Sequence, residues 1–440
     1  MEAGEDFDLD PLVIEDRTER GELVGGIRYA LLPKKSRGGS VSIMLGLRFG
    51  TEATLKSRIA AAELLGTLMA RGTTDLSHQE LEDELTRLRA DLSISSQPGL
   101  LQMQVVTQQQ HLSQVVDLLL QIVRSPALAG ADLEIVRRQL LTSLEAGLNE
   151  PQALAPRRVR QLLAPYQANN IRYERSIEEE MELYRSVTIE DVRELYAGFI
   201  GNQAGELVMV GNFDPQTVQS QWKAGLADWT AAEPYERFDR PAHPEVPGGL
   251  ELIQTPDKSN AMLFAQQHYA LKDDHPDYPS LVIGNFVLGG GTLSSRLADR
   301  VRQQEGLSYT IRSAISGRQR DERTDFTLYA IMNPENLDPL KAAIMDELDK
   351  IRDEGVSQTE LDRAKRAYLE GQGVQRTNDR ALASLLMSTM FNQRTMAFYQ
   401  QHESAVAALT IAQVNEALQK YLQPEKLVIV AAGDFDGGED

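Results

Sequence analysis

The chain contains one sequence pattern twice, and this internal duplication limits its possible folds more than any other feature. The stretch VTIEDVRELYAGFIGNQAGELVMVGNFD begins at Val187, and LTIAQVNEALQKYLQPEKLVIVAAGDFD begins at Leu409, an offset of 222 residues without a gap. Each copy predicts a helix, a turn, an apolar strand and a Gly-(Asn/Asp)-Phe-Asp turn. A chain with such a repeat is expected to fold as two related structural units.

Looser matches extend the duplication along the chain. Gly72 corresponds to Gly291 at an offset of 219 residues, a drift that small loop insertions would produce. We therefore expect a first half over residues 1–230 and a second half over residues 250–440. Residues 231–249 contain four prolines and two glycines, which predicts an extended linker between the halves.

The apolar pattern in each half predicts both strands and helices. Residues 40–49 alternate between apolar and small or polar side chains, as in a half-buried strand. Residues 59–69 have apolar side chains at helical spacing, and Gly72 is placed to end that helix. Strands followed by pairs of helices favour an α+β fold, in which each half is an antiparallel sheet with helices packed on one face.

Composition excludes several classes of protein. The chain has 45 Lys and Arg against 65 Asp and Glu, a net charge of −20, so the basic face of a nucleic-acid-binding protein is not expected. It contains no cysteine, which excludes thiol catalysis, disulfides and cysteine-based metal sites. No apolar run approaches the length of a membrane span, and residues 1–20 lack the pattern of a signal peptide.

Several motifs in the right order resemble the insulinase/pitrilysin family of zinc peptidases over nearly the whole chain. They are the two Gly-(Asn/Asp)-Phe-Asp turns, the helix ending in Arg71-Gly72-Thr73, and SSRLADRVRQQEGLSYTIRS in the second half. The resemblance implies that the two homologous halves of this chain together form one side of a clamshell-like metallopeptidase. It also implies where a zinc site would lie.

The residues of that zinc site are absent. In active family members the helix before Gly-Thr carries His-x-x-Glu-His, in which two His ligate zinc and the Glu activates the bound water. In the helix expected over residues 55–71, these five positions hold Glu63, Leu64, Leu65, Gly66 and Thr67. One carboxylate is too little for a zinc site, and a third ligand near residues 143–145, such as Glu145, would not complete it.

Two other motifs offer alternative ligand sites. His268 and His275 flank Asp273 and Asp274, so a metal there is one interpretation and a solvated loop at a strand end is the simpler one. The triple glycine at residues 289–291 is not followed by Lys-Ser/Thr, which argues against a phosphate-binding loop. We expect these glycines to let the chain pass close to substrate or to a facing half.

Arg302 and Tyr309 are the candidate catalytic residues. Ser294 or Ser295 can cap a short helix that Gly306 ends, which places Arg302 on its last turn and Tyr309 at the start of a strand. This Arg-x6-Tyr spacing resembles that of the family's functional pair. A phenol hydroxyl can donate to the oxyanion formed when a peptide carbonyl is attacked, and a guanidinium can bind a carbonyl or carboxylate. The alternative is that the positive charge of Arg302 stabilises the C-terminal end of its helix through the helix dipole, and that Tyr309 packs in the core.

The resemblance therefore implies a non-catalytic half of a two-part zinc peptidase, inactive alone. Arg302 and Tyr309 would act in a chamber shared with a homologous His-x-x-Glu-His half, which would hold the zinc; this chain would bind no cofactor. We expect Arg296 and Arg300 to be structural, with Arg296 the better candidate for an additional contributor. The partner would be a separate subunit or part of a longer chain, since the N-terminal segment resembles the junction in tandem members.

We expect peptide substrates and a periplasmic location, with the cytoplasm as the alternative. The rival function is that of a structural or peptide-binding protein of the same fold, like the family's core subunits of respiratory complexes. Metal-free hydrolysis by this chain alone would need a nucleophile–base motif, which the sequence does not offer.

Overall fold

The computed structural model describes residues 4–291 and 295–435 of the chain, which form two compact α+β units. The first unit comprises residues up to 141, 181–238 and 372–400. The second comprises residues 142–180, 239–371 and 401 onward. Each unit thus includes a segment from the other half of the sequence, so the units do not follow the boundaries expected at residues 230 and 250. Residues 231–248 contain no helix or strand.

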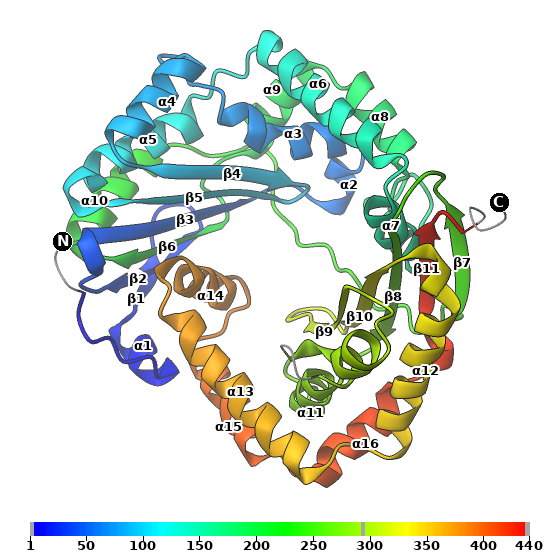
Figure 1. Ribbon diagram of the computed structural model, residues 1–440. Helices are drawn as coiled ribbons and strands as arrows, with labels where there is room; N and C mark the ends of the chain where they lie inside the picture. Colours follow the sequence, from blue (N-terminus) through cyan, green and yellow to red (C-terminus); the bar gives the residue numbers. More distant parts are fainter. Residues whose placement is uncertain (1–3, 292–294, 436–440) are drawn as a thin grey trace. The chain divides into compact units, whose positions relative to one another are not determined.

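The first unit is built on a six-stranded mixed sheet with the order β1-β2-β6-β3-β5-β4 (Figure 1). The strands are β1 (Glu19–Glu22), β2 (Ile27–Pro33), β3 (Ser40–Arg48), β4 (Asp91–Gln97), β5 (Leu100–Gln108) and β6 (Gly205–Gly211). Strands β2 and β6 are parallel, and the other neighbours are antiparallel. The strand expected at residues 40–49 is confirmed as β3.

The second unit repeats this topology with five strands. They are β7 (Gly249–Gln254), β8 (Ala261–Tyr269), β9 (Thr310–Gly317), β10 (Thr324–Met332) and β11 (Val428–Gly433). Their order is β7-β11-β8-β10-β9, with β7 and β11 parallel, which matches β2-β6-β3-β5-β4. The duplication in the sequence is therefore present in the strand order, although each sheet is mixed and not antiparallel as expected.

Helices make up most of the remaining structure. Those assigned wholly to the first unit are α1 (Pro11–Arg17), α2 (Glu52–Leu55), α3 (Ile59–Met69), α4 (His78–Arg87), α5 (Leu112–Arg124), α9 (Ile189–Phe199), α10 (Pro215–Leu226) and α14 (Asp379–Phe391). Those of the second are α7 (Pro151–Leu163), α11 (Tyr278–Asn285), α12 (Leu337–Asp353), α16 (Ile411–Tyr421) and the π-helical segments η3 (Phe286–Gly290) and η4 (Ala298–Gln304). Four of the described helices contain residues of both units: α6 (Gly130–Gly147), α8 (Ile177–Ser186), α13 (Gln358–Arg376) and α15 (Ala397–Ala408).

Helix α14 covers one face of the first sheet, although it comes from the second half of the sequence. Its buried side chains Leu382, Leu386 and Met390 belong to one cluster with Leu32 and Val208 of the sheet. Figure 1 shows α14 against this sheet, with α3 and α5 on the opposite face. Both faces of the sheet are therefore covered, and β6 is buried along its whole length.

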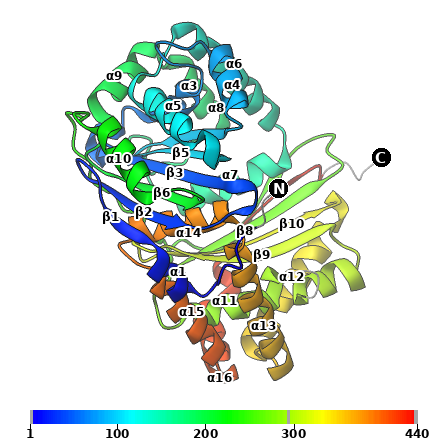
Figure 2. The same cartoon turned by 90° about the vertical axis from the view of Figure 1, so that its left-hand side faces the viewer.

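Helix α7 has the equivalent place in the second unit. Its residues Ala155, Val159 and Leu163 pack with Val428 and Val430 of β11. The alternate strand residues belong to a separate core that also contains residues of α11, α12 and α16, and Figure 2 shows α7 and α11 on opposite sides of the second sheet. The helices cover two faces of each sheet and not one as expected, because each half of the sequence supplies a helix to the other half's sheet.

The matched helices α9 and α16 begin in the same way. The side chains of Thr188 and Thr410 accept hydrogen bonds from the backbone N–H of Asp191 and Gln413, whose side chains bond back to the capping residues. The repeated sequence is thus matched by the same capping box in both copies.

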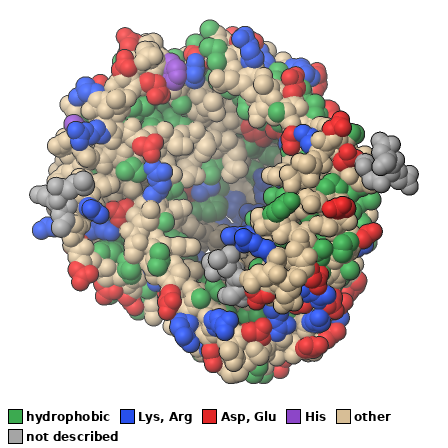
Figure 3. All heavy atoms as spheres, viewed as in Figure 1, with side chains coloured by type: hydrophobic (Ala, Val, Ile, Leu, Met, Phe, Trp, Pro, Cys, Tyr) green, Lys and Arg blue, Asp and Glu red, His purple; other side chains and the backbone are tan. Residues whose placement is uncertain are grey.

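Acidic and basic side chains are interspersed on the face drawn in Figure 3. Among the described residues, none of the helices is both long and apolar enough to cross a membrane.

Candidate functional site

Helix α3 (Ile59–Met69) corresponds to the helix on which zinc ligands were sought. Gly72 follows it with a φ of 134°, a conformation that favours glycine at a helix end. The prediction of a helix followed by Gly72 is confirmed, but the helix runs over Ile59–Met69 and not over residues 55–71, because the chain leaves the helical conformation between α2 and α3.

Gly66, at the position of the family's catalytic Glu, lies directly against strand β4. A Cβ added to Gly66 would be 2.7 Å from the backbone carbon of Ser95 and 2.9 Å from the backbone nitrogen of Ser96. The Gly66 N–H donates to Ser96 Oγ at 2.7 Å, and that hydroxyl donates to the Glu63 carbonyl at 3.2 Å. The strand backbone thus fills the space that a larger side chain would need.

The other positions on α3 do not fit a zinc ion either. The Glu63 carboxylate accepts a hydrogen bond from the Tyr184 hydroxyl at 2.9 Å, whereas Leu64 and Leu65 are buried in the core. Glu145 is exposed on α6. Within residues 4–291 and 295–435, the structure contains no group of three His, Asp or Glu side chains able to hold a metal.

His268 lies in strand β8 with only 2% of its side chain exposed. Its Nδ1 accepts the backbone N–H of His243 at 3.1 Å, and its Nε2 is 3.3 Å from Asp325 Oδ1. The expectation of a solvated loop is therefore wrong for His268. It suits His275, whose side chain is partly exposed and accepts the Asp277 N–H.

The protonation of His268 gives a pH-dependent stability. Burial, followed by the charges of Arg323, His243 and Arg318, lowers the pKa of His268 to about 4 although Asp325 opposes this. The unfolded chain, with a His pKa near 6.5, then binds a proton between about pH 6.5 and 4 that the folded chain does not. The free energy of unfolding should therefore be highest above pH 6.5 and fall, by up to about 3 kcal/mol, as the pH drops to 4.

Urea unfolding at pH 7 and at pH 5 would measure this loss. The variant His268→Gln should reduce the difference between the two pH values, and His275→Gln, in the exposed loop, should leave it unchanged. An equal difference in both variants would contradict the assignment to His268.

Arg302 lies on η4 and Tyr309 directly precedes β9, as the sequence predicted. Ser295 accepts the Ala298 N–H at 3.4 Å, while Ser294, the other candidate cap, lies outside the described residues. Arg302 is exposed, and no hydrogen bond or ion pair of its side chain is found in the described part of the chain.

Tyr309 is 62% exposed. Its hydroxyl donates to Asn333 Oδ1 at 3.0 Å, and its N–H donates to the Ile331 carbonyl at 3.0 Å. A tyrosine used for core packing would bury its ring, so this exposure argues against the packing interpretation. The phenol oxygen is held at the surface by a defined acceptor.

The first copy lacks this pair. At the offset set by Gly72 and Gly291, the positions equivalent to Arg302 and Tyr309 hold Asp83 and Ala90. The starts of β4 and β9 obey the same offset, since Asp91 corresponds to Thr310. The motif is therefore a property of the second half and not of the repeated fold.

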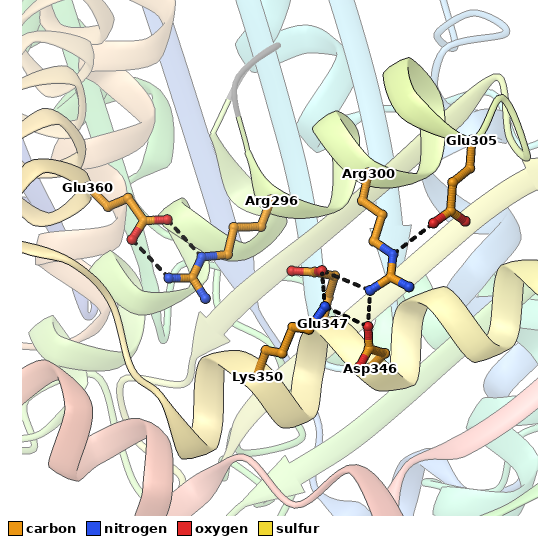
Figure 4. A network of polar contacts seen from close by, with 7 residues as sticks. All are labelled: Arg296, Arg300, Glu305, Asp346, Glu347, Lys350 and Glu360. Carbon is orange, nitrogen blue, oxygen red and sulfur yellow. Dashed lines mark hydrogen bonds and ion pairs between the residues drawn. The ribbon is translucent and has the colours of Figure 1, made fainter.

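Arg296 and Arg300 have structural partners, as Figure 4 shows. Arg296 forms a bidentate pair with Glu360 at 2.7 and 2.8 Å and also donates to the Gly355 carbonyl. Arg300 binds Asp346, Glu347 and Glu305. Arg300 thus fixes η4 to α12, and Arg296 fixes the residues just before η4 to α13, which agrees with the structural role expected for them.

The triple glycine has a packing explanation. A Cβ on Gly289 would lie 2.5 Å from Ser313 Oγ and 3.0 Å from the Ser313 backbone nitrogen in β9. A Cβ on Gly290 would lie 2.4 Å from Asn285 Nδ2. These glycines let η3 approach β9 and α11 within the same unit. The expected approach to substrate or a facing half stays a prediction.

The described residues therefore combine a duplicated α+β topology with a helix, α3, whose position Gly66 has no room for the zinc-site residue that the resemblance implied. Comparison with known families gives the same result: residues 186–368 match the model described as the peptidase M16 inactive domain. This match supports the resemblance to a non-catalytic member of the insulinase family that was inferred from the sequence.

One curated relative is the "Non-peptidase homolog YmxG" of Helicobacter pylori (strain ATCC 700392 / 26695). It is 21% identical over 387 residues, which cover 87% of this chain and 86% of the relative.

Three solved structures have the same fold. The peptidase M16 inactive domain from Pseudomonas fluorescens has a TM-score of 0.83 at 19% identity, with 94% of this chain and 97% of that chain covered. A protease from Helicobacter pylori has a TM-score of 0.81 at 15% identity, with 94% and 99% covered. A conserved protein from Enterococcus faecalis V583 has a TM-score of 0.74 at 16% identity, with 95% and 98% covered.

Proposed function

We propose that this chain is the non-catalytic partner of a zinc-dependent endopeptidase or oligopeptidase and contributes Arg302 and Tyr309 to a shared substrate chamber. The observation that carries this proposal is the exposure of Tyr309, whose hydroxyl is oriented by Asn333 and remains accessible. Arg302, also exposed, lies on the preceding helical segment. Both side chains are exposed, so packing in the core does not account for the choice of these two residue types.

The pair would bind a peptide and stabilise charge on it. The Tyr309 O–H would donate to the carbonyl oxygen that becomes negative during hydrolysis, and the Arg302 guanidinium would bind a neighbouring carbonyl or carboxylate. Activation of water would belong to the partner half, because Gly66 and its neighbours do not fit a metal ion. This division makes the chain inactive alone and needed in the complex.

The partner would be a homologous His-x-x-Glu-His half that holds zinc, either as a separate subunit in a heterodimer or in the same polypeptide. We place the complex in the periplasm, in agreement with the absence of cysteine, with unfolded peptides as substrates. A structural or peptide-binding role without proteolysis is the second candidate, and the name of the Helicobacter pylori relative, a non-peptidase homolog, favours it.

Affinity purification of the tagged chain from its source cell tests the proposal. The expected result is co-purification of a zinc peptidase with His-x-x-Glu-His, and peptide hydrolysis by the mixture that neither purified component shows alone. Recovery of a membrane redox complex, or full activity of the zinc half without this chain, would contradict it.

A further inference from the structure

The second unit contains a cationic cavity that involves neither Arg302 nor Tyr309. The cavity has a volume of about 150 Å³, many times the space that one water molecule needs. Its wall contains five guanidinium groups and one carboxylate, from Arg160, Arg172, Arg240, Arg318, Arg323 and Glu174. This concentration of positive charge is unusual in a chain with a net charge of −20.

These arginines come from segments far apart in the sequence. Arg160 lies on α7, Arg172 follows that helix, and Arg240 belongs to the segment expected to be a linker. Arg318 and Arg323 lie in the turn between β9 and β10. The fold therefore gathers them into one place, which solubility alone would not require.

Carboxylates fix several of these side chains without filling the cavity. Arg160 pairs with Glu174 at 2.7 Å, and Arg172, only 9% exposed, pairs with Asp239. Asp325 binds Arg323 at 2.7 Å and lies 3.6 Å from Arg318.

Such pairs orient guanidinium groups before a ligand arrives, so less conformational entropy is lost on binding. The same wall carries further polar groups, because the Tyr166 hydroxyl is 3.0 Å from His243 Nε2 beside His268.

The charge of Arg240 lies close to those of other arginines. The residue is exposed, but its partial removal from water, followed by the charges of Arg318, Arg323 and Arg172, lowers its pKa, against the effect of Glu174. Arginine does not lose its proton in proteins, so this repulsion remains in the folded chain. An anion in the cavity would relieve it.

We propose that this cavity binds a phosphate group, either as free inorganic phosphate or as the phosphoryl group of a small ligand. Planar guanidinium groups bind phosphate oxygens in pairs through charge-assisted hydrogen bonds. A carboxylate offers two oxygens, whereas guanidiniums on several sides of one cavity match the larger number of oxygens and the higher charge of phosphate.

Isothermal titration of the purified full chain with inorganic phosphate, at constant ionic strength in chloride, tests this site. We expect saturable binding that Arg240→Gln weakens at least about tenfold, because it removes a charged donor. The matched control is Arg363→Gln, an exposed arginine on α13 of the same unit, which should bind phosphate as the wild type does. Equal affinity in the two variants, or no saturable binding by the wild type, would overturn the proposal.

A second variant guards against misfolding. If thermal unfolding shows that Arg240→Gln is not folded, Arg318→Gln, whose side chain is about half exposed, should show the same weakening. Unchanged binding in a folded Arg318→Gln variant would then reject the site.

The two sources of the phosphate group are separated by titration with phenyl phosphate. Tighter binding of inorganic phosphate supports a free anion, and tighter binding of phenyl phosphate supports a phosphorylated small ligand. Acetate that binds as tightly as both would show a general anion site and reject the phosphate assignment.

Discussion

Tyr309→Phe is expected to lower the turnover of the reconstituted peptidase complex by roughly 10²-fold while peptide affinity stays nearly constant. The change removes only the hydroxyl that would donate to the developing oxyanion, an interaction worth on the order of 3 kcal/mol in the transition state. Because the donor acts mainly after attack on the carbonyl, kcat should fall and KM should change little.

Steady-state hydrolysis of a quenched fluorescent peptide by the complex would measure this effect. Tyr173→Phe is a matched control, since it also removes a hydroxyl that donates hydrogen bonds, here to Glu179, and it should leave turnover unchanged. Asn333→Ala removes the acceptor that orients Tyr309 and should give a smaller loss. Normal turnover of Tyr309→Phe would exclude the hydroxyl from the chemistry.

Gly66→Glu is expected to destabilise the first unit by roughly 3 kcal/mol. The new side chain would begin 2.7 Å from the backbone of Ser95, and a strand backbone cannot move aside as a flexible side chain can, so the helix and β4 must separate. For the same reason, the triple change Glu63→His, Gly66→Glu and Thr67→His should not create a tight zinc site.

The free energy of unfolding in urea would test this prediction. Thr67→Glu is the matched control because Thr67 is exposed on the same helix, where a substitution usually changes stability by less than about 0.5 kcal/mol. If Gly66→Glu were as stable as this control, β4 would not be fixed against α3. Zinc binding by the triple variant, measured by titration, would lead to the same conclusion.

The features predicted well from the sequence are those that depend on local spacing. The repeat, the helix ended by Gly72 and the places of Arg302 and Tyr309 all follow from residues close together in the chain. The role of the pair could not be decided in that way. Asn333, the acceptor for Tyr309, is 24 residues further along and has no sequence signal that connects it to the tyrosine.

The features missed depend on contacts between distant segments. An amphipathic pattern shows that α14 has an apolar face but not which sheet it covers, so the exchange of helices was not predicted. The cationic cavity was missed because Arg172, Arg240 and Arg323 are separated by more than 60 residues. Short groups of arginines, such as those at residues 157–160 and 318–323, were visible in the sequence, but nothing there connected them to one another.

The exchange of α7 and α14 has a consequence for synthesis of the protein on the ribosome. Strand β6 ends at Gly211, but α14 begins at Asp379. The apolar face that includes Val208 and Val210 is therefore synthesised long before the helix that packs on it. At about 5–20 residues per second, this interval lasts on the order of 10 to 40 seconds. During that time the nascent chain exposes an apolar surface that can aggregate. The yield of folded protein in cells should therefore depend on the capacity of molecular chaperones.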